Sequence, residues 1–183
     1  MPTIITHAVV PLAIGLGLGT GAVSRRLLLA GVVASIMPDM DVVAFKLGIA
    51  YADAFGHRGA SHSLAFALLL GLLALACAPA LRTSRLAAFV FVTLSTLSHP
   101  VLDMFTDGGL GVAMWWPLAS DRLFAPWRVI EVSPIGVTRF LTERGLAVLK
   151  SEFIWVWLPA IVAGITLFFV RSSRTGIEVR NQE

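Results

Sequence analysis

The stretch LAAFVFVTLSTLSHPVLDMF, residues 86–105, decides the fold of this chain. It is almost entirely apolar, it contains no lysine or arginine, and Arg85 precedes it. A helix needs about 20 predominantly apolar residues to cross the hydrocarbon of a bilayer. We therefore predict a membrane-spanning helix over Leu86–Phe105, with His99 and Asp103 toward its second end.

The composition of the whole chain points the same way. Of its 183 residues, 57% are hydrophobic and 14% charged, and the mean hydropathy is +0.84. Soluble domains carry about 25% charged residues, so these values favour a membrane protein, and the length favours a single domain over residues 1–183. The single cysteine, Cys77, excludes a disulfide within the chain and a zinc site built on cysteines. The basic residues are not interleaved with aromatic ones, so we expect no nucleic-acid partner.

Other apolar segments complete a bundle. The further predicted helices are Thr6–Val23, Leu27–Met37 with a continuation over Val42–Ile49, a third from Ser61 as its N-cap to about Leu81, and Phe153–Val170. No basic residue precedes the first of these, so we interpret it as a retained membrane segment and not as a signal peptide. The fold class is then all-α: a polytopic membrane bundle of about five helices, or four with a re-entrant segment.

Two polar stretches do not fit a span. Residues 106–150 contain glycine and proline and predict a long irregular loop or lid on one face, and residues 171–183 predict a polar, loosely ordered tail. The tryptophans between Trp115 and Trp127 fit an interfacial belt. The alternative is a lid over the site in which Arg122 and Arg128 bind an anionic substrate.

Threading the predicted helices back and forth across the membrane brings every histidine to one face. With His7 on that face, the second helix returns to it at Asp39, the third leaves it after His62, and the fourth returns to it at His99. The opposite face carries short connections and the tail, with Arg25, Arg26, Arg82, Arg85, Arg171, Arg174 and Arg180. Short loops rich in arginine are typical of the cytoplasmic side, so the histidine face is predicted to be extracytoplasmic.

The residues on that face suit a metal site. His99 and Asp103 are four positions apart, which places them on one face of a helix, although Pro100 between them predicts a kink or break. Asp39 and Asp41 flank a turn, and His57 and His62 bracket a glycine-containing turn. Imidazole and carboxylate ligands together suit zinc, with manganese or iron as alternatives. The number of candidates is enough for one or two ions.

The motifs also resemble a known family. Thr-His at residues 6–7, Pro-Asp-x-Asp at 38–41, His-Arg-Gly-x-Ser-His-Ser at 57–63 and Ser-His-Pro-x-Leu-Asp-x-x-Thr at 98–106 are similar to the YdjM-like predicted inner-membrane metal-dependent hydrolases, also described as LexA-binding hydrolases. The stretch from Trp116 to Gly136 resembles that family too. The resemblance implies a bacterial inner-membrane, multi-pass protein distantly related to zinc-dependent phospholipase C and nuclease folds. It implies as metal ligands His7, Asp39, Asp41, His57, His62, His99 and Asp103.

The function that these observations predict is a membrane-embedded metal-dependent hydrolase of the phosphoesterase type. Its substrates would be lipid head groups or lipid-linked phosphates, because the site lies at the membrane interface. Asp39, Asp41 or a spare histidine would act as general base, and Arg58 would bind a phosphate oxygen or else the lipid interface. Two alternatives stay open: a metal or ion transporter, and a structural membrane protein that a metal stabilises. Metal flux separates the first from a hydrolase, and a fully closed coordination sphere would indicate the second.

Overall fold

The computed structural model describes residues 1–134 and 136–180, and within them the chain forms helices and no β-strand. The elements in chain order are α1 (Ile4–Leu18), α2 (Arg25–Ile36), the 3₁₀ helix η1 (Met37–Val42), α3 (Val43–Lys46), the 3₁₀ helix η2 (Ala60–His62), α4 (Leu64–Ala76), α5 (Arg85–Met104), α6 (Val137–Phe140), α7 (Glu143–Glu152), the π-helix η3 (Phe153–Trp157) and α8 (Leu158–Arg180). The predicted all-α membrane bundle is confirmed.

Three continuous helical stretches are long and apolar enough to cross a membrane: Arg25–Lys46, Arg85–Met104 and Glu143–Ser173. The apolar helices α1 and α4 are shorter, with 15 and 13 residues. At 1.5 Å per residue, α1 is about 22 Å long. The membrane-spanning helix predicted from residues 86–105 is therefore present, together with four apolar partners.

The ends of several helices differ from the prediction. Pro38 changes the second helix to a 3₁₀ turn without ending it, because a proline in the first turn of a helix forfeits no hydrogen bond. The last helix begins at Glu143, well before Phe153, since the polar residues of α7 form an amphipathic turn whose buried face is Gly145, Val148 and Glu152. The irregular segment that follows α5 is correspondingly shorter than 106–150.

Two further expectations are corrected at the helix ends. The N-cap of α4 is Ser63, which accepts a hydrogen bond from the Phe66 amide, whereas Ser61 donates to Asp41. The predicted loose tail is helical as far as Arg180, because no proline interrupts it, and its last residues, 181–183, lie outside the described residues.

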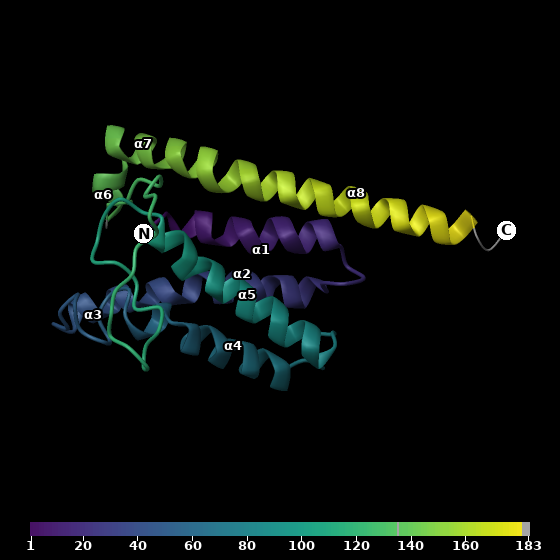
Figure 1. Ribbon diagram of the computed structural model, residues 1–183, viewed down its shortest axis with the longest axis horizontal. Helices are drawn as coiled ribbons and strands as arrows, with labels where there is room; N and C mark the ends of the chain where they lie inside the picture. The colour runs from purple at the N-terminus through teal and green to yellow at the C-terminus, as the bar shows by residue number, and fades with distance from the viewer. Residues whose placement is uncertain (135, 181–183) are drawn as a thin grey trace.

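The helices pack in the order α8, α1, α2, α5, α4, each against the next (Figure 1). Small residues set the closest approaches. A Cβ atom on Gly17 of α1 would lie 2.5 Å from the carbonyl oxygen of Gly164 in α8, and one on Gly71 of α4 would lie 1.9 Å from Thr93 Oγ1 in α5. Close packing of small residues of this kind drives helix association in lipid, because the hydrophobic effect does not favour moving apolar surface from lipid into a helix interface.

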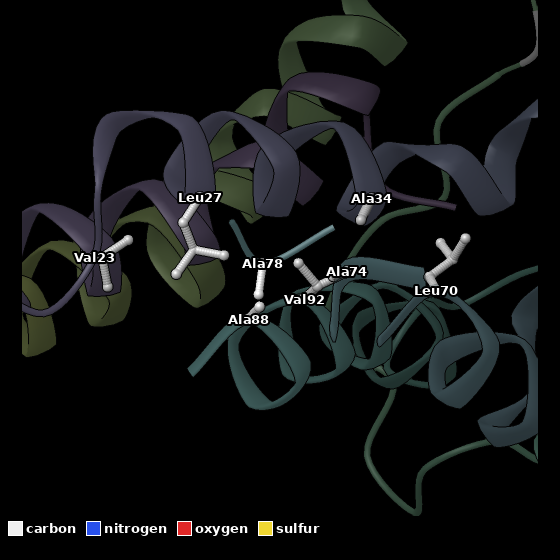
Figure 2. Close-up of a cluster of buried hydrophobic side chains, with 8 residues drawn as sticks. All are labelled: Val23, Leu27, Ala34, Leu70, Ala74, Ala78, Ala88 and Val92. Carbon is white, nitrogen blue, oxygen red and sulfur yellow. The ribbon is translucent and has the colours of Figure 1, made fainter. Parts of the chain in front are cut away.

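The apolar core lies between α2, α4 and α5 and is made largely of small side chains (Figure 2). Its buried members are Val23, Leu27, Ala34, Leu70, Ala74, Ala78, Ala88 and Val92. Leu27 has no exposed surface. Val23, Ala78 and Ala88 place one end of this core at the connections from α1 to α2 and from α4 to α5.

The two ends of the bundle have different contents. One end, here called the polar end, holds the start of α1, η1, η2, the end of α5 and the segment 106–134; the other, here called the arginine end, holds the short connections 19–24 and 77–84 (Figure 1). All four histidines lie at the polar end, so the threading prediction is confirmed. At the arginine end, Ser24 and Ser84 cap α2 and α5.

Candidate metal centre

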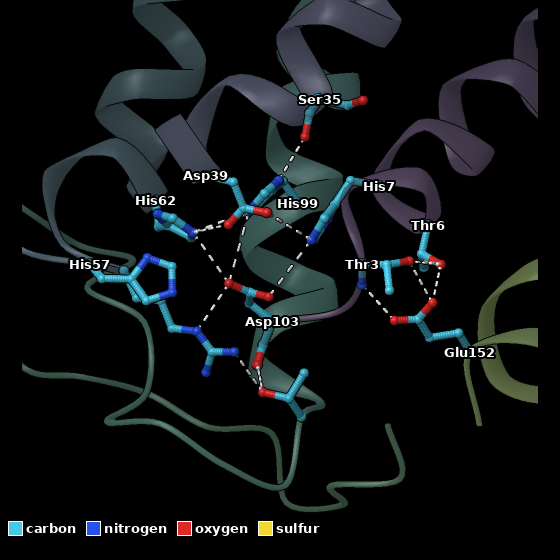
Figure 3. Close-up of polar contacts among 12 residues, drawn as sticks. Thr3, Thr6, His7, Ser35, Asp39, His57, His62, His99, Asp103 and Glu152 are labelled. Carbon is cyan, nitrogen blue, oxygen red and sulfur yellow. Dashed lines mark hydrogen bonds and ion pairs between the residues drawn. The ribbon is translucent and has the colours of Figure 1, made fainter. Parts of the chain in front are cut away.

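Five ionisable side chains from four segments meet inside the polar end (Figure 3). They are His7 of α1, Asp39 of η1, His62 of η2, and His99 and Asp103 of α5. One nitrogen or oxygen of each of the last four lies within 4.8 Å of the others. The structure therefore brings together, around one point, residues that are far apart in the sequence.

The spacings between these atoms fit a single ion. His62 Nε2 lies 3.1 Å from His99 Nε2 and 3.2 Å from Asp103 Oδ2, and His99 Nε2 lies 3.3 Å from Asp39 Oδ1. The longer separations, from His62 to Asp39 and from His99 to Asp103, are 3.8 and 3.9 Å. Four tetrahedral ligands about 2.1 Å from a zinc ion would be about 3.4 Å apart. The donor atoms are thus spaced as coordination requires.

Local structure fixes two of these residues on α5. The helix is unbroken from Arg85 to Met104 although it contains Pro100, so of the predicted kink or break at that proline the break does not occur. The unbroken turn keeps His99 and Asp103 one turn apart on the same buried face.

Hydrogen bonds outside the cluster orient both of its central imidazoles. His99 Nδ1 lies 2.7 Å from the carbonyl oxygen of Ser35, which can only accept, so that nitrogen donates and Nε2 faces the cluster. His62 Nδ1 lies 3.1 Å from Asp41 Oδ2 and 3.0 Å from Ser61 Oγ. Partners of this kind hold metal-ligating histidines in the required tautomer and orientation.

His7 is the fifth member of the cluster. Its ring stacks on that of His99, with centroids 3.5 Å apart and an interplanar angle of 11°. His7 Nε2 lies 3.8 Å from Asp39 Oδ2 and 3.9 Å from Asp103 Oδ1, beyond hydrogen-bonding distance. Neither ring nitrogen of this fully buried residue has a hydrogen-bond partner among the described residues.

The buried carboxylates are also short of partners. All four oxygens of Asp39 and Asp103 lack a hydrogen bond within the described part of the chain. Buried polar groups are almost always hydrogen-bonded, and buried charges are paired or bind metals. A divalent cation between these oxygen and nitrogen atoms would therefore supply the partner that they lack.

The electrostatics of His62 show the same need for positive charge. Burial lowers the pKa of this imidazole, but its ion pairs with Asp103, Asp39 and Asp41 outweigh burial and raise the pKa to about 10. In the metal-free protein a proton on His62 therefore balances part of the carboxylate charge. A cation would take over that role when it binds.

Arg58 supplies a second positive charge from the side. It is fully buried, with a backbone φ of +61°, and its Nε lies 3.1 Å from Asp103 Oδ2. The two terminal nitrogens donate to the Gly108 carbonyl and to the Thr106 hydroxyl, both at 2.9 Å. The guanidinium is thus directed at Asp103 and at the loop after α5, away from the protein surface.

Asp41 and His57, two of the seven predicted ligands, lie beside the cluster and not in it. His57 Nδ1 is 2.5 Å from Asp41 Oδ1. The other oxygen of Asp41 accepts hydrogen bonds from Ser61 and from the Arg58 amide. This places the Asp41 carboxylate behind His62, as a support for the imidazole, with His57 behind Asp41.

The predicted anion-binding arginines of the long loop have other contacts. Arg122 donates to the backbone carbonyls of His57, Tyr51 and Asp53, so it ties the loop to the segment between α3 and η2. Arg128 lies over the ring of Phe124. The contacts of Arg122 are therefore structural: they hold the long loop against the segment that carries His57.

Glu152 is a buried residue that sequence reasoning missed. Its carboxylate accepts hydrogen bonds from the Thr3 amide and from the hydroxyls of Thr3 and Thr6, next to His7 (Figure 3). Trp157 Nε1 donates to the same Thr6 hydroxyl at 2.7 Å. The contacts join α7 and η3 to the start of α1. The available signal was a glutamate directly before the apolar run of the last helix.

Comparisons with known proteins agree with the membrane-type helical fold. The model of the family described as YdjM inner membrane protein matches residues 1–177. The inner membrane protein YbcI of Escherichia coli (strain K12) is 48% identical to this chain over 163 residues, which are 88% of this chain and 94% of that protein. No solved structure matches the chain significantly.

Proposed function

The chain belongs to the YdjM inner membrane protein family, and we propose that it is a membrane-embedded, metal-dependent hydrolase of phosphate esters. The observation that carries the proposal is the convergence of Asp39, His62, His99 and Asp103 on one buried point, with carboxylate oxygens that lack a hydrogen bond among the described residues. Ionisable groups within membrane helices are costly and are kept for function.

We assign one ion to the site. Asp39, His62, His99 and Asp103 supply the donors, and His7 is adjacent as a fifth. Among the described residues we assign no ligand set to a second ion, because the remaining predicted ligands, Asp41 and His57, bind one another. Two imidazoles and two carboxylates suit Zn²⁺, and after it Mn²⁺ or Fe²⁺. When bound, such an ion supplies a Lewis acid and an activated water.

The side chains around the site have distinct roles in this proposal. Asp39 has an oxygen free of hydrogen bonds and the only exposed surface in the cluster, so it is the carboxylate we assign to proton removal from water. Asp41 is already engaged by three groups and supports His62. Arg58 is a positioning residue for Asp103, because its burial keeps it from a substrate phosphate.

The position of the site suggests its substrates and its side of the membrane. The cluster lies at the end of α5 and not at its middle, so lipid head groups and lipid-linked phosphates are the nearest phosphate esters. The same position argues against a transporter, whose ions are bound near the bilayer midplane. The arginine end carries short basic connections, so we place it in the cytoplasm and the site on the extracytoplasmic face.

A second candidate is a structural membrane protein that the metal stabilises. The observation that favours it is burial, since four of the five cluster residues have no exposed surface. Structural metal sites are closed, whereas catalytic sites keep one position open. Activity of the purified protein decides between the two candidates.

The test compares two histidine variants in the full-length protein, purified in detergent and supplied with zinc. We expect one bound ion in the wild type and hydrolysis of p-nitrophenyl phosphate and of phosphatidic acid that a chelator abolishes. His62→Ala should weaken zinc binding by more than about 100-fold and remove activity, because it deletes a donor at the centre of the cluster. The matched control, His57→Ala, should change zinc affinity by less than about tenfold.

Three results would argue against the proposal in different ways. Absence of a bound transition metal in the wild type would remove its basis. Stoichiometric metal without any phosphoester hydrolysis would favour the structural candidate. Equal loss of metal in His57→Ala and His62→Ala would mean that the assigned ligand set is incorrect.

A further inference from the structure

A cleft opens beside the metal cluster at the polar end. Its walls are the chain start from Met1 to Ile5, residue Val42 of η1, and the segment Ser133, Pro134, Gly136 and Phe140, and its volume is roughly 450 Å³. Asp39 is the one cluster residue that lines it. We call it the Asp39 cleft. Its size is within the range of small-molecule sites, about 300–1,000 Å³.

Exposure shows that this cleft is the side from which the cluster can be reached. His7, His62, His99 and Asp103 have no exposed surface, and Asp39 is 3% exposed. Any molecule that meets an ion held by these residues must therefore approach past Asp39. The Asp39 cleft is the cavity found at that point.

The walls of the cleft are chemically unlike the cluster. Ile4, Ile5, Val42, Pro134 and Phe140 present hydrocarbon to it, and Asp39 is the only acidic side chain among its lining residues. Ile4 and Ile5 are more than half exposed and belong to the first turn of a membrane helix. The cleft thus runs from hydrocarbon-facing surface to a carboxylate of the site.

We propose that the Asp39 cleft binds an aliphatic chain of a lipid phosphate, with the phosphate group at the metal cluster. The inference rests on the proposed function for the position of the phosphate, and on the cleft itself for the chain. The hydrocarbon part of these walls offers nothing to a water-soluble phosphate ester. A lipid phosphate has an aliphatic chain for the hydrocarbon walls and a phosphate group for the metal cluster beyond Asp39. Such a lipid reaches the first turn of α1 without leaving the bilayer.

The first experiment measures binding and needs no turnover. The full-length protein is placed in phospholipid nanodiscs with zinc and a phosphatidic acid that carries a diazirine in one acyl chain, and the photocrosslinked peptides are mapped by mass spectrometry. Crosslinks should concentrate in the peptides that contain residues 1–5, 42 and 133–140. Val42→Trp fills the cleft and should lower their yield by about tenfold, the loss expected when two methylene groups are expelled from an apolar site.

Matched controls separate the cleft from general damage. Val43→Trp places the same side chain at the next position, which is exposed and outside the lining, and should leave the yield unchanged. Phe140→Ala removes a side chain from the wall of the cleft and should also lower the crosslink yield. Leu141→Ala, at the exposed neighbouring position, should leave the crosslink yield unchanged. Bound zinc reports that each variant is folded.

The second experiment measures turnover with long and short substrates. In Val42→Trp, kcat/KM should fall about tenfold more for dioleoyl phosphatidic acid than for p-nitrophenyl phosphate. Crosslinks spread evenly over the lipid-facing surfaces of α4 and α8 would overturn the cleft proposal, and so would an equal loss for both substrates. Crosslinks in the cleft without any turnover would support the chain site and would contradict the hydrolase proposal alone.

Discussion

The polar end and the arginine end of the bundle carry their charges in opposite ways. At the polar end, Arg58, Asp103 and His62 are fully buried, and both Arg58 and His62 contact Asp103. At the arginine end, Arg26 is exposed and its guanidinium donates to the Ala80 carbonyl. Burial of a charge costs several kcal/mol unless close partners compensate it. The comparison teaches that, among the side chains that the structure describes, buried charges lie at the polar end alone, and that end is where function is expected.

The apolar core reinforces this division. Small side chains such as Ala78 and Ala88 fill the bundle next to the arginine end, without a buried ionisable group among the members of that core. One end is thus built for helix association and the other for binding. Three measurements test how complete the division is.

The largest expected effect concerns the compartments that the two ends face. The single cysteine, Cys77, is exposed at the end of α4, beside the arginine end. In cells with an intact inner membrane, a membrane-impermeant maleimide added from outside should leave Cys77 unlabelled, because short basic connections stay in the cytoplasm. A Cys77→Ser, Ser120→Cys variant moves the thiol to an exposed position at the polar end and should be labelled almost completely.

Permeabilised cells provide the control, since both thiols should then react. Labelling of Cys77 from outside, with Ser120→Cys protected, would invert the topology and place the metal cluster in the cytoplasm. Such a result would leave the cluster and its chemistry unchanged.

The next effect compares the same substitution at the two ends. Arg58→Ala removes the cation beside Asp103 and leaves a buried carboxylate uncompensated, which typically costs about 3–5 kcal/mol. Arg26→Ala at the arginine end removes an exposed side chain and should cost less than about 0.5 kcal/mol. The free energy of unfolding of the metal-free proteins in detergent is the quantity to measure. Similar losses in the two variants would mean that burial of charge does not distinguish the ends.

Zinc should reduce the difference in unfolding free energy between Arg58→Ala and Arg26→Ala, because an ion at the cluster also compensates the charge of Asp103. The stability that zinc restores to Arg58→Ala therefore reports the position of the ion. If zinc does not stabilise Arg58→Ala, the ion is bound elsewhere.

Much of the fold follows from the sequence because membranes simplify the problem. A run such as Leu86–Phe105 must be helical to satisfy its backbone in hydrocarbon, and the order of such runs fixes which ends meet. The boundaries are less predictable where tertiary contacts decide them. Glu143–Glu152 is polar enough to read as loop, yet it is helical because Val148 and Glu152 are buried against the rest of the chain.

The candidate site could be predicted by residue type but not by role. Every histidine and aspartate of the conspicuous motifs lies at the polar end, and the sequence contains the information for that. The direction in which each side chain points from its turn could not be predicted from the sequence. The spacing of Asp39 and Asp41 is compatible with two ligands, but the 3₁₀ turn directs Asp39 into the cluster and Asp41 toward His57. Glu152 was missed because its partners, Thr3 and Thr6, are almost a full chain length away.

The smallest expected effect is the pH dependence of metal binding. In the metal-free protein the pKa of His62 is raised to about 10, from an ordinary value of 6.5. Its proton therefore adds stability that is complete below pH 6.5 and is lost as the pH rises through about 10. An ion that binds His62 must displace this proton, so zinc affinity should rise about tenfold per pH unit between those limits, or about 1.4 kcal/mol per unit.

Chelator competition at several pH values from about 6.5 to 8.5, with calorimetry in buffers of different ionisation enthalpy, measures both the affinity and the protons released. Asp41→Asn sharpens the test: it removes one of the groups that raise the pKa of His62, so fewer protons should be released at the upper end of that range. The exposed Arg26→Ala variant at the other end should reproduce the wild-type profile, because its side chain contacts none of the titrating groups. A zinc affinity independent of pH in the wild type would show that His62 is not a ligand, and the charge balance at the polar end would then depend on Arg58 and Asp103 alone.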